Sequence, residues 1–152
     1  MNCVDFNAIN ASASALTTQR LRMDVVSSNI ANAQTTRATV NENGEYEPYR
    51  RKVVVMESGE NNFNSILKYA TNKSSSISNV TVSEIRADDN PFKVVYNPTH
   101  PDANEAGYVQ MPNVDPLQEM VDLMSATRSY EANITALNAS KSMLMKALEI
   151  GK

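Results

Sequence analysis

The sequence predicts a mainly α protein in which long N- and C-terminal helices pair as a coiled coil and a small β-containing insert separates them. Both terminal segments place apolar residues at helical spacing, and after the first turn neither is interrupted by glycine or proline. Asn and Ser, which favour caps and turns, number eighteen and fifteen and are concentrated in the middle of the chain. We therefore predict a helix at 1–33, an Asn/Ser-rich extended insert with a few strands at 34–113, and a helix at 114–152.

The N-terminal helix is predicted over residues 6–31. Apolar residues recur there at alternating four- and three-residue steps once Arg20 and Ser27 are counted in the series. Asp5 has a side chain suited to an N-cap, so we expect the helix to begin after it. The apolar members of this stripe are Ile9, Ala13, Leu16, Met23 and Ile30.

The C-terminal helix has the clearer boundary signals. Asp115 is a capping residue, Pro116 suits the first helical position, and Gln118 stands at the capping-box position. The next glycine or proline is Gly151, which suits the C-terminal stop. These signals predict a helix of roughly 35 residues and about 52 Å. A helix of that length exceeds the ~40 Å diameter of a compact domain of this size.

The apolar residues of the C-terminal helix form two adjacent stripes that lie about 100° apart around the helix axis. The N-terminal helix can cover only one of them, so we expect a second chain to cover the other. The sequence thus predicts an oligomer or a filament subunit. One stripe runs through Leu117, Met120, Met124, Ile134, Met145 and Leu148. The other runs through Leu123, Ala126, Tyr130, Leu137, Leu144 and Ala147.

The insert contains three predicted strands, all rich in Val and Ile. They lie at Lys52–Glu57, Asn79–Arg86 and Phe92–Tyr96. The stretch Ser58–Ser78 is rich in Asn and Ser, and within it Phe63–Leu67 is suited to a short helical turn. The insert alone offers few large apolar residues, so we expect it to have only a small core of its own.

Composition argues against several classes of protein. The chain has 14 basic and 17 acidic residues and a formal net charge of −3, which is unfavourable for nucleic-acid binding. Its longest apolar run, Val53–Met56, is far too short to span a bilayer, and we expect neither membrane insertion nor a cleaved signal peptide. The basic run 50–52 is interpreted as the polar approach to a strand, with contact to phosphate or an acidic partner as the alternative.

The residues that usually carry chemistry are scarce. Cys3 and His100 are the single cysteine and histidine of the chain, so no disulfide and no histidine-cluster metal site can form within it. No phosphate-binding glycine loop, nucleophile elbow or pair of catalytic carboxylates is present in the sequence. We therefore predict that the protein is not an enzyme and has no catalytic, cofactor-binding or metal-binding residues.

Polar residues at or beside the apolar seams are more informative. In a simple coiled coil such positions hold Leu, and a polar group there lowers stability but can fix register and partner choice. We expect Arg128 and Glu131 to help set register. The predicted assembly interface comprises Ile9, Leu16, Arg20, Met23, Asn29, Ile30, Asn32, Met120, Met124, Arg128, Tyr130, Glu131, Asn133, Ile134, Leu137, Lys141, Leu144 and Leu148.

Several short motifs resemble the axial proteins of the bacterial flagellum, and among them the proximal rod proteins of the basal body most closely. Asn29-Ile30-Ala31-Asn32-Ala33 is similar to the end of the first helix in that group. The resemblance is most specific over residues 107–146. The further motifs are Tyr49-Arg50-Arg51, Gly107-Tyr108-Val109, Pro112-Asn113-Val114-Asp115, Glu119-Met120-Val121, Ala126 to Asn133, and Lys141-Ser142-Met143.

This resemblance implies a structural subunit whose terminal helices polymerise into the proximal part of a hollow, torque-transmitting rod in the periplasm. It implies self-association and contact with other rod proteins, the rod-to-ring adaptor, the membrane ring and the flagellar type III export apparatus. Two alternatives within secreted proteins are a type III-secreted coiled-coil effector and another proximal rod protein of the axial family. A third is an enzyme built on the insert, for which no residues can be named.

Overall fold

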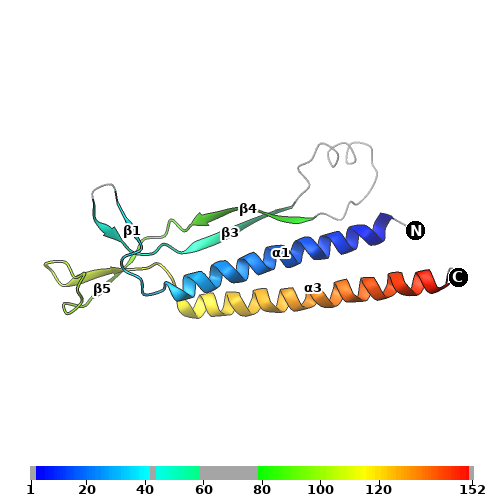
Figure 1. Ribbon diagram of the computed structural model, residues 1–152. Coiled ribbons are helices and arrows are strands. Elements are labelled where there is room, and N and C mark those ends of the chain that lie inside the picture. Colours follow the sequence, from blue (N-terminus) through cyan, green and yellow to red (C-terminus); the bar gives the residue numbers. More distant parts are fainter. Residues whose placement is uncertain (1–2, 42–43, 59–78, 151–152) are drawn as a thin grey trace. The chain divides into compact units, whose positions relative to one another are not determined.

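The structure is a computed structural model that describes residues 3–41, 44–58 and 79–150 (Figure 1). Among these residues, one long helix precedes three pairs of short strands in the sequence and a second long helix follows them. The predicted coarse fold, terminal helices with a strand-containing insert, is confirmed. The elements are α1 (Cys3–Ala31), β1 (Thr39–Val40), β2 (Tyr46–Glu47), β3 (Lys52–Ser58), β4 (Val80–Ala87), β5 (Lys93–Tyr96), β6 (Tyr108–Met111) and α3 (Pro116–Ile150).

The chain divides into two compact units. Unit 1 comprises Met1–Met23, Val54–Glu84 and Ser125–Lys152, and unit 2 comprises Asp24–Val53 and Ile85–Met124. Each unit therefore combines parts of both helices with parts of the insert. This division by contacts runs across the predicted boundaries at 33 and 113, which separate the chain by element type.

The helix α3 begins as its capping signals predict. The Leu117 amide donates to Asp115 Oδ1 at 3.1 Å, so Asp115 caps the helix and Pro116 is its first residue. The described helix has 35 residues. The expected stop at Gly151 lies outside the described residues.

The helix α1 ends at Ala31 as predicted but begins at Cys3, so the expected N-cap at Asp5 is wrong. Asp5 is the third residue of the described helix, and acidic residues are favoured in a first turn as well as at an N-cap. An acidic residue at the start of a helix therefore does not distinguish a cap from a first-turn position. At the other end, the Asn32 side chain donates to the Ser28 carbonyl at 2.9 Å and satisfies one of the last acceptors.

In the part of the chain that the structure describes, the strands form three separate two-stranded sheets, β1–β2, β3–β4 and β5–β6. The predicted strands match β3, β4 and β5 to within about one residue at each end. Sequence reading missed β1 and β2, which have two residues each, and β6. In the antiparallel β5–β6 pair Tyr96 faces Tyr108, and their rings meet edge to face with centroids 5.3 Å apart. The suggested helical turn at Phe63–Leu67 lies outside the described residues.

Gly107 is required at the start of β6. Its φ is +79°, and a Cβ there would lie 2.9 Å from Tyr96 Cε2. Glycine thus permits both the backbone turn and the position of the Tyr96 ring.

The core of the described residues is small. In unit 1, α1 contacts the first residue of β4, because the Thr18 hydroxyl donates to the Val80 carbonyl at 3.4 Å and the Val80 amide donates to Ser14 Oγ at 3.3 Å. The buried apolar residues are Val25, Val26, Tyr49, Val109 and Val114 in unit 2 and Ala126 in unit 1. Within the described residues, neither helix contains a stretch apolar and long enough to cross a membrane.

Candidate assembly interface

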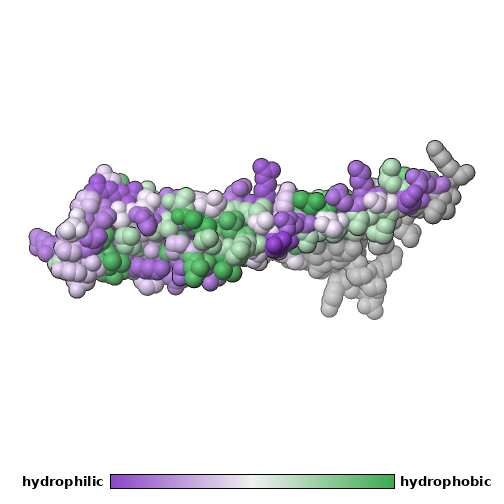
Figure 2. Space-filling model, turned by 90° about the horizontal axis from the view of Figure 1, so that it is seen from below, coloured by the Kyte–Doolittle hydropathy of each residue, from purple (hydrophilic) through white to green (hydrophobic). Residues whose placement is uncertain are grey.

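The two apolar stripes of α3 differ in exposure. All six members of the first stripe are exposed, from 37% for Ile134 to 73% for Leu117. We call this set (Leu117, Met120, Met124, Ile134, Met145 and Leu148) the outer stripe. In Figure 2, which views the chain from below Figure 1, hydrophobic side chains gather over the first turns of α3.

The second stripe is largely covered by the chain itself. Ala126 is fully buried, and Leu123, Tyr130, Leu137 and Leu144 are half-buried. In unit 1 the Thr127 hydroxyl, next in sequence to Ala126, lies 3.5 Å from Met23 Sδ, so α1 contacts α3 beside this stripe. We call this stripe, without the exposed Ala147, the inner face.

In unit 2 the start of α3 is anchored by polar groups through Glu119. The centre of this anchor is the carboxamide of Asn29, near the end of α1. Its Oδ1 accepts hydrogen bonds from the Tyr49 hydroxyl at 3.0 Å and the Lys52 amide at 2.9 Å. Its Nδ2 donates to the Lys52 carbonyl at 2.9 Å and to Glu119 Oε2 at 2.9 Å. Asn29 is fully buried, and these four bonds use the whole hydrogen-bonding capacity of an amide.

The guanidinium of Arg51 contacts carboxylates on α3 and in the segment after β4. Its Nε donates to Glu119 Oε1 at 2.5 Å and its Nη2 donates to Asp122 Oδ2 at 3.4 Å, both on α3. Its Nη1 lies 3.6 Å from Asp88 Oδ2, just after β4. Because Glu119 is fully buried, removing its partner would leave an uncompensated charge in the interior.

The backbone around Arg51 is also fixed by side chains. The Arg51 amide donates to Asn113 Oδ1 at 2.7 Å, and Asn113 Nδ2 donates to the Asn90 carbonyl at 3.2 Å. Asn113 thus joins the segment before β3 to the segments that flank the β5–β6 pair. We call Asn29, Tyr49, Arg51, Asn113 and Glu119 the polar cluster.

The contacts around Arg51 shift the pKa values of Arg51 and Asp88. Burial opposes the charge on Arg51, but the hydrogen bond to Glu119 and the charges of Glu119, Asp88 and Asp122 raise the Arg51 pKa above its ordinary value. The backbone amide of Asn90 and then the Arg51 charge hold the pKa of Asp88 below its ordinary value. Arg51 and Asp88 therefore both keep their charges at neutral pH.

A second polar contact fixes the loop between β5 and β6. Asp102 accepts hydrogen bonds from Arg37 Nε at 2.7 Å and from the Thr36 hydroxyl at 2.8 Å, and these bonds lower its pKa. The Asp102 amide donates to His100 Nδ1 at 3.1 Å. The His100 side chain therefore accepts a hydrogen bond within this loop. Among the described residues no group of three or more His, Cys, Asp or Glu could hold a metal ion.

The predicted interface residues divide between the inside and the outside of the chain. Asn29 is fully buried in the polar cluster. The half-buried members are Ile9, Leu16, Met23, Ile30, Asn32, Tyr130, Asn133, Leu137 and Leu144. The exposed members are Arg20, Met120, Met124, Arg128, Glu131, Ile134, Lys141 and Leu148.

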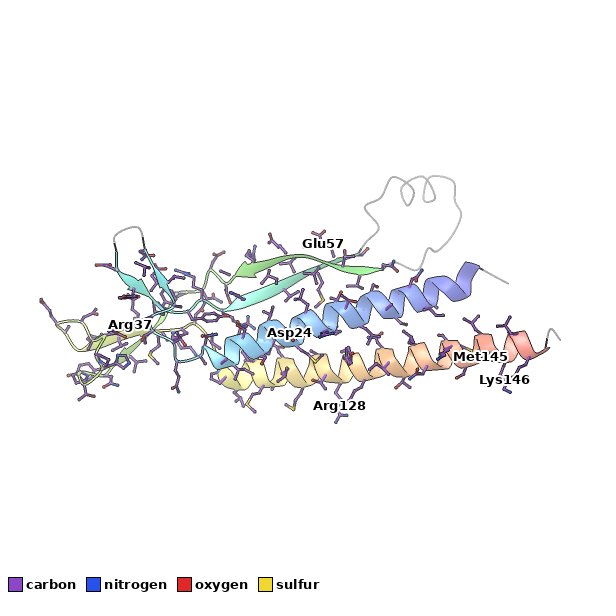
Figure 3. The ribbon with its side chains drawn as sticks, in the orientation of Figure 1. Asp24, Arg37, Glu57, Arg128, Met145 and Lys146 are labelled. Atoms are coloured by element: carbon purple, nitrogen blue, oxygen red, sulfur yellow. The ribbon has the colours of Figure 1, made fainter. Side chains whose placement is uncertain are left out.

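Two exposed ion pairs lie within α3. Arg128 Nη1 lies 3.1 Å from Glu131 Oε2, and Lys146 Nζ lies 2.6 Å from Glu149 Oε2. Figure 3 shows the Arg128 and Lys146 side chains projecting from α3 on the side away from α1 in unit 1. Both pairs are mostly exposed and contribute little to folding.

Sequence reasoning did not identify Tyr49, Asn113 or Glu119 as functional candidates, and it considered Arg51 only within the basic run 50–52, with contact to phosphate or an acidic partner as the alternative. One signal could have found them, because every member of the polar cluster lies in a motif that carries the family resemblance. Residues 29, 49–51, 112–115 and 119–121 are far apart in the sequence, and the structure brings them together in unit 2.

Comparisons with known proteins agree with these motifs. The family described as "Flagella basal body rod protein" matches residues 9–39, and "Flagellar basal body rod FlgEFG protein C-terminal" matches residues 105–150. The chain is 63% identical to the flagellar basal-body rod protein FlgC of Bacillus subtilis, over 97% of this chain and 98% of the relative. It is 42% identical to FlgC of Borreliella burgdorferi, over 95% and 96%, and 39% identical to FlgC of Salmonella typhimurium, over 96% and 97%.

Proposed function

This chain belongs to the FlgC-type flagellar basal-body rod proteins, and from that membership we propose that it assembles into the rod through the outer stripe of α3. It is a structural subunit of the basal-body rod and not an enzyme. Its relatives match it over nearly the whole chain, so the alternative of a secreted effector is not favoured.

The observation that carries the proposal is the exposure of the outer stripe. In its first turns Leu117, Met120 and Met124 are 73%, 54% and 60% exposed. Large apolar residues that stay exposed along one side of a helix are typical of a surface that a partner covers. Methionine side chains adapt to irregular partner surfaces, which suits a subunit that meets several different neighbours.

The proposal extends to how the helices pack and to which neighbours they meet. Contacts between α1 and α3 within each unit support a coiled-coil pair that neighbouring subunits extend. Membership of the rod family supports assembly with other rod proteins. We place the chain in the proximal part of a hollow rod, with the rod-to-ring adaptor, the membrane ring and the type III export apparatus as further partners.

The test replaces two outer-stripe residues with charge. Met120→Asp/Met124→Asp places two carboxylates on an exposed surface, so the isolated subunit should lose only about 1 kcal/mol of stability from helix propensity. Assembly should fail, because the charges would be buried against a neighbour without partners. The variant is expressed in a strain that lacks the native chain, and swimming and basal-body structure are scored.

Gln118→Asp is the matched control, since Gln118 is exposed on the same helix but outside the outer stripe. It should fold, assemble and support swimming. Circular dichroism of each purified variant checks that α3 remains helical. Normal swimming by the Met120→Asp/Met124→Asp variant would exclude the outer stripe as the assembly surface.

A further inference from the structure

We propose that Arg51 is the positioning residue that fixes the rotation of α3 about its own axis in unit 2, and thereby selects which of the two apolar stripes faces outward. The inference rests on the proposed function of the outer stripe, because rotation matters to assembly only if that stripe is the assembly surface. It adds a determinant of orientation that lies outside the helices.

The first step is that apolar burial does not select the rotation. The two stripes of α3 lie about 100° apart, and that angle is the rotation between successive residues such as Leu123 and Met124. Both stripes carry large apolar side chains, so either could cover the end of α1 with a similar gain from burial. A rotation by one residue's angle would exchange Leu123 and Met124 between the covered and the exposed side.

The second step is that the Arg51 contacts fit only one rotation. Glu119 and Asp122 are three residues apart on α3, which places them about 60° apart around the axis and ~4.5 Å apart along it. One planar guanidinium contacts both, through Nε and Nη2, at 2.5 and 3.4 Å. Two contacts at different heights and angles fix both the rotation and the axial position of the helix.

The third step connects this contact to the outer stripe. Leu117 precedes Glu119 by two residues, so it lies about 200° away, on nearly the opposite side of the helix. Glu119 is 0% exposed and Leu117 is 73% exposed, as that geometry requires. Turning Glu119 away from Arg51 and Asn29 would leave its carboxylate without these partners, which strongly disfavours the other rotation.

Arginine is needed for this role, because a lysine in its place would keep the charge but lose the planar fork. Arg51→Lys can bind Glu119 as a point charge without contacting Asp122 at the same time. The variant should therefore fold with a helical α3 whose rotation is no longer fixed.

The experiment measures rotation in the free subunit by thiol labelling. In a Cys3→Ser background, one reporter carries Met124→Cys, on the exposed side, and the other carries Leu123→Cys, on the half-buried side. With Arg51 present, the thiol at position 124 should react faster with a maleimide than the thiol at 123. With Arg51→Lys the ratio of the two rates should fall towards one while the helix content stays the same.

Two further variants separate positioning from folding. Arg50→Lys is the matched control, because Arg50 stacks 4.4 Å from the centre of the Phe92 ring, and it should keep the parent ratio. Asp122→Asn keeps the buried Glu119 paired with Arg51 and removes the charge that Arg51 contacts at position 122, so it should fold and lower the ratio. If both Arg51→Lys and Asp122→Asn keep the parent ratio, the positioning role is overturned.

The labelling result does not depend on assembly. Swimming by the Met120→Asp/Met124→Asp variant would overturn the proposed assembly surface and leave the labelling ratio unchanged. Retention of the parent ratio in Arg51→Lys and Asp122→Asn would overturn the positioning role and leave the assembly surface intact.

Discussion

In the first turns of α3 a charged side chain is buried and a large apolar side chain is exposed, which is the reverse of the usual distribution. Glu119 is fully buried, whereas Leu117, only two residues earlier, is 73% exposed. The buried carboxylate is stable because Arg51 and Asn29 bind both of its oxygens. The exposed leucine has no comparable explanation within a single chain. The inner side of the helix thus stabilises the subunit's own fold, and the exposure of the outer side supports our proposal that a neighbouring subunit covers it.

The largest effect is expected from disturbing the inner side. Asn29→Asp keeps the side-chain shape but removes both amide donors and places a second carboxylate beside Glu119. We expect a loss of about 3 kcal/mol in the free energy of unfolding, measured by urea denaturation.

The control for this change is Asn133→Asp. Asn133 is half-buried and donates to the Ser129 carbonyl within α3, so the loss should stay below about 1 kcal/mol. Equal losses at the two positions would show that the polar cluster has no special part in the fold.

A larger side chain should lower the free energy of unfolding at a buried position of α3 but not at an exposed one. Ala126 is fully buried, so Ala126→Leu should cost about 1–3 kcal/mol through overpacking of its surroundings. Ala136→Leu, at an exposed position of the same helix, should change stability by less than about 0.5 kcal/mol. A stable Ala126→Leu variant would mean that these surroundings are not closely packed. Thermal melts followed by circular dichroism distinguish the outcomes.

Acid should weaken unit 2 through Asp88 and Asp102. Both have pKa values below the ordinary 3.8, from the Asn90 amide in one case and the Arg37 hydrogen bond in the other. Each therefore stabilises the folded state fully above about 3.8, and this contribution is lost as the pH falls through the lower folded pKa. Urea midpoints measured from pH 6 to pH 2 should show the decline. Asp102→Asn should make it shallower, and an unchanged slope would contradict the assignment.

The smallest effect is expected for the exposed charges on α3. The side chains of Arg128 and Glu131 are 84% and 57% exposed, and Arg128→Gln should alter the free energy of unfolding by less than about 0.5 kcal/mol. A loss above about 1 kcal/mol would show that the pair supports the fold of the single chain. Urea denaturation beside the parent protein gives the comparison.

The parts of the fold that local chemistry determines were predictable. Asp115 and Pro116 specify the start of α3, and the run of valines specifies β3. The strands β1 and β2 were missed because two residues carry no periodicity. The start of α1 was misplaced because an acidic residue suits either a cap or a first turn.

The candidate site was predictable only in part. The spacing of Met120, Met124 and Ile134 predicted an apolar stripe beyond what one partner helix covers, and these residues are exposed. The polar cluster was not predicted, because Arg51 and Glu119 are 68 residues apart and pair only after the insert folds back onto α3. A buried ion pair leaves no periodic signal in a sequence, since each partner alone resembles an ordinary surface charge.

Oxidation of methionine by dilute hydrogen peroxide tests most directly whether the outer stripe is the assembly surface. The oxidation is read by mass spectrometry in free subunits and in purified basal bodies. Met120, Met124, Met143 and Met145 are 54–66% exposed, whereas Met23, Met56 and Met111 are half-buried. In free subunits the first group should oxidise faster, because its sulfur atoms are accessible. In assembled rods Met120 and Met124 should become protected. Equal oxidation of these two residues in both states would contradict the claim that the outer stripe is the assembly surface.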